Sequence, residues 1–172
     1  MTKLRIVLIV VVTALVVSVL GACGEPEVSA QGTDGKNIET LGTDLLPADL
    51  LGLKVQAEDI SGTIASEQRT YVEATSLYSL RSDDLLQATL QVSRFNSDAD
   101  ADSPGFRRSL LNQIGGSRPR AVRLGDETIY LTSGTKQQLA VWFRGRHLLV
   151  LATREDYPRP KSLLRRALEV QP

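Results

Sequence analysis

The chain has 172 residues, of which 42% are hydrophobic and 23% are charged, a composition typical of a soluble globular protein rather than a disordered one. This length provides one domain of ordinary size and leaves no room for a second, enzyme-sized domain. The formal net charge is zero, which removes the usual electrostatic argument for a nucleic-acid-binding protein. A single cysteine excludes an intramolecular disulfide, so the fold must depend on its core.

The N-terminal segment has the charge and hydropathy pattern of an export signal. Lys3 and Arg5 form a short positive region, and Ile6 to Leu20 follow without any charge. This apolar run is shorter than the roughly 20 residues that a membrane-spanning helix requires. We therefore expect residues 1–22 to be a removable signal peptide.

The signal ends in Leu20-Gly21-Ala22-Cys23, which resembles the lipobox of bacterial lipoproteins. The resemblance implies cleavage between Ala22 and Cys23 and a diacylglyceryl group on the Cys23 thiol. The acyl chains, palmitate in type, would hold the protein on the extracytoplasmic face of the cell membrane, because each buried methylene contributes about 0.8 kcal/mol. Two alternatives are an uncleaved transmembrane anchor and an ordinary secretory signal in which Cys23 has no role.

A polar tether and one folded domain follow the signal. Residues 23–43 are rich in Glu, Pro, Ser, Gln, Gly and Asp and have almost no apolar periodicity, which is typical of a flexible, solvated linker. Leu45 and Leu46 then open the apolar pattern. We expect a single α+β domain over residues 44–172.

Apolar and polar residues alternate in several segments of this domain, which predicts strands. A polar turn at Arg81-Ser82-Asp83-Asp84 joins the first two segments into a long β-hairpin, and short loops join the last three into an antiparallel meander. The five predicted strands cover residues 70–80, 85–95, 128–132, 138–143 and 147–153.

Two segments have the spacing of amphipathic helices. The first begins at Ser103-Pro104 and ends at Gly115-Gly116, and the second begins at Pro160. The economical architecture is an α+β two-layer sandwich, an antiparallel sheet of about five or six strands with both helices on one face. This order of elements loosely resembles small domains of uncharacterised actinobacterial lipoproteins, some of which are similar to the Mog1/PsbP fold. No residue motif accompanies that resemblance, so it implies no catalytic residues.

His147, the only histidine, is the one residue that suggests catalysis. A nucleophilic triad would need an acid and a nucleophile beside it, and nothing in the spacing selects them. The chain has no Gly-x-Ser-x-Gly elbow, no phosphate-binding loop and no set of histidines for zinc. We predict no catalytic residues, no metal and no cofactor, and we favour a domain that is not an enzyme. A surface hydrolase using His147 is the alternative.

An acidic loop precedes the first predicted helix. Asp98, Asp100 and Asp102 alternate there, and oxygen ligands at every second position are typical of calcium-binding loops. The match is incomplete, because Ser103 and Ser109 stand where an EF-hand loop needs Gly and Glu. We therefore interpret the segment as a solvated loop rather than a calcium site.

Charge is distributed unevenly along the chain. Cys23 to Gly105 contain 5 Lys and Arg against 15 Asp and Glu, whereas Phe106 to Pro172 contain 13 against 5. The two halves either neutralise each other in the fold, which we favour, or leave a basic patch for anionic headgroups or wall phosphates. The candidate contacts of such a patch are Arg144, Arg146, Arg165 and Arg166.

These features together favour a lipid-anchored cell-envelope protein that acts as a non-catalytic binding or accessory module. We expect its partners to be the membrane, through the N-terminal lipid, and an envelope protein or a wall polymer, but no nucleic acid. A carrier of a lipid or other apolar ligand is a further alternative, which requires a cavity between sheet and helices.

The lipobox is tested by changing Cys23 to Ala. The variant should incorporate no labelled fatty acid and should accumulate as the full-length precursor, because the family's peptidase acts only after lipid transfer. Metabolic labelling followed by gel electrophoresis measures both effects. A normal-sized mature product from this variant would contradict the lipoprotein interpretation.

Overall fold

The structure, a computed structural model, describes residues 41, 45–58, 60, 71–96, 101–115, 119–134 and 136–172. The predicted signal peptide, the lipobox with Ala22 and Cys23, and almost all of the predicted tether lie outside the described residues.

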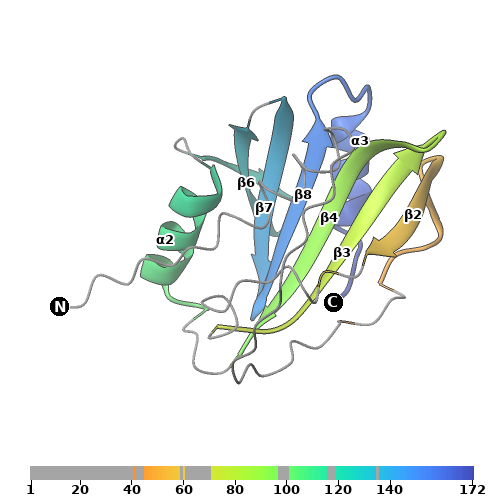
Figure 1. Cartoon of the computed structure of the whole chain (residues 1–172). Coiled ribbons are helices and arrows are strands. Elements are labelled where there is room, and N and C mark those ends of the chain that lie inside the picture. Colours follow the sequence, from red (N-terminus) through yellow and green to blue (C-terminus); the bar gives the residue numbers. More distant parts are fainter. Residues whose placement is uncertain are drawn as a thin grey trace, which may run out of the picture.

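The described residues form one antiparallel sheet of eight strands and two helices (Figure 1). The strand order is β1-β2-β3-β4-β8-β7-β6-β5, so that two four-stranded meanders meet along β4 and β8. The strands are β1 (Asp49–Leu50), β2 (Leu53–Glu58), β3 (Val72–Ser82), β4 (Leu85–Phe95), β5 (Arg120–Leu124), β6 (Glu127–Gly134), β7 (Gln137–Arg144) and β8 (His147–Arg154). The helices are α2 (Pro104–Gly115) and α3 (Pro160–Ala167).

The α+β class and the five predicted strands are confirmed, as β3, β4, β6, β7 and β8. The predicted number of five or six strands is too small, because β1, β2 and β5 extend the sheet at its two edges. The edge strands are only partly covered, and exposed or half-buried residues fill most of β2 and β5. The alternation of Leu53, Val55 and Ala57 with polar residues was an available signal for β2, whereas β1 has only two residues and β5 has no regular alternation.

The β3–β4 turn explains why the predicted hairpin forms in this register. Ser82 pairs with Leu85, which leaves a two-residue loop with φ angles of 47° at Asp83 and 63° at Asp84. Two consecutive left-handed residues are typical of the turn that matches strand twist, and aspartate is among the residues that tolerate this region.

The two helices cover opposite faces of the sheet, so the prediction that both lie on one face is wrong. Successive strand residues point to opposite faces, and the buried residues of β7 and β8 divide in this way between two clusters. Helix α3 packs in the cluster that contains Ala140, Trp142, Leu149 and Leu151. Helix α2 packs in the cluster that contains Val141, Leu148 and Val150. In Figure 1, α3 is seen behind the strands.

The N-terminal part of the described chain adds to the α3 face. Leu41, which we expected within the tether, is buried in the same cluster as α3, together with Leu46 and Leu50. Its carbonyl accepts a hydrogen bond from the Ser76 hydroxyl on β3. The chain therefore enters the fold on the face that α3 covers.

Truncation of the sheet core should destabilise the fold strongly. Leu90 and Val141 are each 1% exposed and Val150 is 2% exposed, so truncating any of them to Ala should lower the free energy of unfolding by about 2 kcal/mol or more. Leu85→Ala is the control, because Leu85 lies on the same strand as Leu90 but is 49% exposed. Urea denaturation measures the differences, and near-neutral effects at all three buried positions would contradict the register.

Candidate functional site

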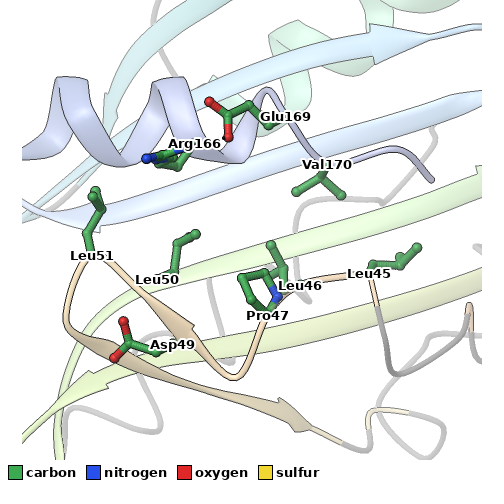
Figure 2. A pocket seen from close by; sticks show the side chains of 9 residues that line it. All are labelled: Leu45, Leu46, Pro47, Asp49, Leu50, Leu51, Arg166, Glu169 and Val170. Atoms are coloured by element: carbon green, nitrogen blue, oxygen red, sulfur yellow. Dashed lines mark hydrogen bonds and ion pairs between the residues drawn. The ribbon is translucent and has the colours of Figure 1, made fainter.

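A cleft of about 290 Å³ lies between residues 45–51 and the C-terminal end of α3. Figure 2 shows the two walls facing each other, one formed by the segment around β1 and the other by the end of α3. The lining residues are Leu45, Leu46, Pro47, Asp49, Leu50, Leu51, Arg166, Glu169 and Val170.

The β1 wall is held by backbone and side-chain hydrogen bonds. Leu51 and Gly52 form the β1–β2 turn with φ angles of 58° and 82°, and the Asp49 carboxylate accepts a hydrogen bond of 3.1 Å from the Gly52 N–H. The Arg159 guanidinium, at the start of α3, donates to the Leu51 carbonyl at 3.1 Å. The turn is thereby tied to the helix that forms the opposite wall.

The α3 wall follows from the amphipathic pattern of the helix. Pro160 opens the helix, and Leu163, Leu164 and Ala167 are buried against the sheet. Arg166 therefore points outward, where it forms an ion pair of 2.9 Å with Glu169. Exposed pairs of this kind contribute little to stability, so the pair can be exchanged for a ligand group at low cost.

Arg144 fixes the chain that follows α3. Its Nε lies 2.6 Å from the Glu127 carboxylate, and its two terminal nitrogens donate to the carbonyls of Leu168 and Val170. The side chain is 19% exposed. Arg144 therefore positions the Val170 side of the cleft, and its role as an anionic-surface contact stays a prediction. Sequence alone cannot show that residues 168–170 pass over the end of β7.

The other three predicted contacts are on the surface but do not form one cluster. Arg165 and Arg166 are exposed on α3. Arg146 lies at the β7–β8 turn, 3.3 Å from the Glu73 carboxylate of β3, which also pairs with Arg94 at 2.7 Å. The structure thus brings two of the four predicted arginines together.

Ion pairs in the described part of the chain join the acidic and basic halves at two places. These are Arg146–Glu73 and the local pair Arg107–Asp102. The other pairs are Arg94–Glu73 within the acidic half, and Arg144–Glu127, Arg154–Asp156 and Arg166–Glu169 within the basic half. Two of the six ion pairs among the described residues thus join the two halves.

His147 has a cationic environment. Burial is the main reason why the pKa of His147 is lowered from its ordinary value of 6.5, and the nearby charges of Arg94 and Arg146 lower the pKa further. A hydrogen bond with the Arg144 backbone and the negative charge of Glu73 act in the opposite direction and raise the pKa. The groups that act on the His147 pKa are thus two guanidinium groups, one backbone group and one carboxylate.

The acidic loop is only partly within the described residues. Asp98 and Asp100 lie outside them, and Asp102 pairs with Arg107 at 2.7 Å. The described residues contain no group of three side chains suited to hold a metal ion. Asp102 is thus engaged with a cation from its own helix.

Sequence reasoning missed the cleft itself. The available signal was the pair of dileucines, Leu45-Leu46 and Leu50-Leu51, all four of which pack in or against the cluster that contains α3. Leu46 and Leu50 are buried, and Leu45 and Leu51 are half-buried along the cleft.

Comparison with family models, curated proteins and solved structures finds no match for this chain. None of the helices in the described ranges has the length and apolar character needed to cross a bilayer. The function is therefore argued from the geometry of the cleft and from the N-terminal motif.

His147 predicts how stability depends on pH. Because its folded-state pKa is lowered, the unfolded chain binds the proton more readily, and the free energy of unfolding should fall as pH decreases from 7 through 6.5 toward 5. His147→Gln should reduce this fall. Urea denaturation of both proteins at pH 7 and pH 5 measures the difference, and equal slopes would show that the environment of His147 is not coupled to folding.

Proposed function

We propose that this protein is a lipid-anchored cell-envelope protein whose folded domain is a non-catalytic binding module. The binding site in this proposal is the cleft between residues 45–51 and α3. The observation that carries the proposal is its lining, in which half-buried leucines lie beside the Arg166–Glu169 ion pair. Such a lining, in which polar surface exceeds apolar surface, offers a partner both apolar contact and charged groups that fix its orientation.

The size of the cleft favours a partner protein over a lipid. Its volume of about 290 Å³ lies at the lower end of the roughly 300–1,000 Å³ typical of small-molecule pockets. Such a volume accepts one or two apolar side chains of a protein segment, whereas a carrier of a two-chain lipid needs more space. The partner class that fits best is therefore an envelope protein with a short apolar segment.

The charged rim supplies the polar part of such a contact. Arg166 and Glu169 are both more than half exposed, so a partner carboxylate or amine can replace one member of the pair without leaving a buried charge. A wall polymer is less favoured, because sugar binding commonly uses an exposed aromatic face and the described residues that line the cleft include no aromatic side chain.

Photo-crosslinking in intact cells tests the binding site. A photoreactive residue at Leu45 should give one discrete adduct with an envelope protein, and the same residue at Leu85 should give none, because Leu85 is exposed on the β3–β4 hairpin. Leu51→Asn should reduce the Leu45 adduct about tenfold, since burying a leucine contributes about 1.5–3 kcal/mol. Asparagine tolerates the positive φ of this position, so folding should be preserved.

Two outcomes would contradict the proposal. Equal adducts from the Leu45 and Leu85 positions would show that the cleft is not selective. An adduct that contains lipid but no protein would favour the apolar-ligand carrier instead.

A further inference from the structure

The outward face of α3 is strongly cationic. Residues 159–169 contain four cations, Arg159, Lys161, Arg165 and Arg166, against the single carboxylate of Glu169. Lys161 and Arg165 are exposed. Within the described part of the chain, Arg166 is the cation of this helix that forms an ion pair, and its partner is Glu169. The apolar side of the helix, in contrast, is buried against the sheet.

The chain enters the domain on the face of the sheet that α3 covers. Leu41 packs in the cluster that also contains Leu163 and Leu164 of α3, and the Ser76 hydroxyl bonds to its carbonyl. Cys23 precedes Leu41 by 18 residues, which can span at most about 65 Å in any conformation. A lipid on Cys23 would thus hold α3 at an effective concentration on the order of millimolar near the bilayer.

We infer that the α3 face is the surface by which the domain lies on an anionic bilayer. The inference rests on the lipid anchor of the proposed function. Lys161 and Arg165 meet the anionic headgroups, and each such cation raises the equilibrium constant for docking about fivefold. The weak electrostatic contact is sufficient because the anchor already supplies proximity.

This orientation gives the cleft a membrane-proximal position. The cleft is formed by α3 and by the segment through which the tether enters, so both lie on the docked side. Helix α2 covers the opposite face, where Arg107 is occupied by Asp102 and lies over the Phe143 ring at 4.9 Å. The partner segment that enters the cleft should therefore be one that lies at the level of the headgroups.

The orientation can be measured on the full lipidated protein in vesicles. Once Cys23 is acylated, Ser162→Cys provides a single labelling site on the exposed side of α3, and Asn112→Cys provides the matched site on the exposed side of α2. A spin label at 162 should show contact with a lipid-borne relaxation agent in vesicles of 70:30 phosphatidylcholine and phosphatidylglycerol. A label at 112 should not, and neither label should show contact in pure phosphatidylcholine.

Paired substitutions separate docking from nonspecific charge effects. Lys161→Ala with Arg165→Ala should lower the docking equilibrium about 25-fold. Arg108→Ala with Arg123→Ala removes the same charge from exposed positions on α2 and β5 and should leave docking unchanged. Salt at 0.5 M, which shortens the Debye length to about 4 Å, should release the label at 162.

Each remaining result would overturn the inference. Equal contact at 162 and 112, contact that persists at 0.5 M salt, or equal effects of the two charge pairs would exclude docking through α3. Flotation with neutral vesicles tests the anchor separately. If the protein floats but the label at 162 shows no contact with the lipid-borne agent in anionic vesicles, only the proposed docking surface is contradicted. If the protein does not float, the lipid anchor and the docking surface are both contradicted.

Discussion

The fold depends on covering both faces of β7 and β8. Every residue from Leu148 to Thr153 is buried, so each face of the sheet centre needs its own apolar layer. Helix α2 supplies one layer and α3 the other. With 8 residues, however, α3 is only about 12 Å long, whereas eight strands at about 4.8 Å spacing extend roughly three times as far. Leu41 and residues 45–51 cover part of the remainder, and the cleft lies between these residues and α3.

Hydrogen bonds and an ion pair hold both walls of the cleft in place, in addition to side-chain packing. Arg144 ties residues 168–170 to β6 through Glu127, and Arg159 ties the β1–β2 turn to the start of α3. Hydrogen bonds to charged groups are stronger than those between neutral groups. A groove bordered in this way keeps its shape without a ligand, which lowers the ordering cost of binding.

Local patterns predicted what is local in this fold. The hairpin turn at Asp83-Asp84, the helix beginning at Pro104 and the apolar side of α3 follow from neighbouring residues, and each is confirmed. The two helices cover opposite faces, and the continuous apolar run from Leu148 to Ala152 is the pattern that indicates a strand covered on both faces. The partners of Arg144 are set by long-range register, which charge and spacing do not encode.

Helix stability does not account for the cations of α3. The partial positive charge at a helix N-terminus favours acidic residues there, by about 0.3–1 kcal/mol each, yet the first turn has no acidic residue and Lys161 occupies it. Arg165 and Arg166 suit the last turn, but the four cations also repel one another across one exposed surface. An arrangement that is unfavourable to the isolated helix becomes favourable when an anionic surface faces it, since the same repulsion is then screened by headgroups. The position of Lys161 is therefore a feature that the proposed contact with an anionic bilayer would account for and that helix stability does not.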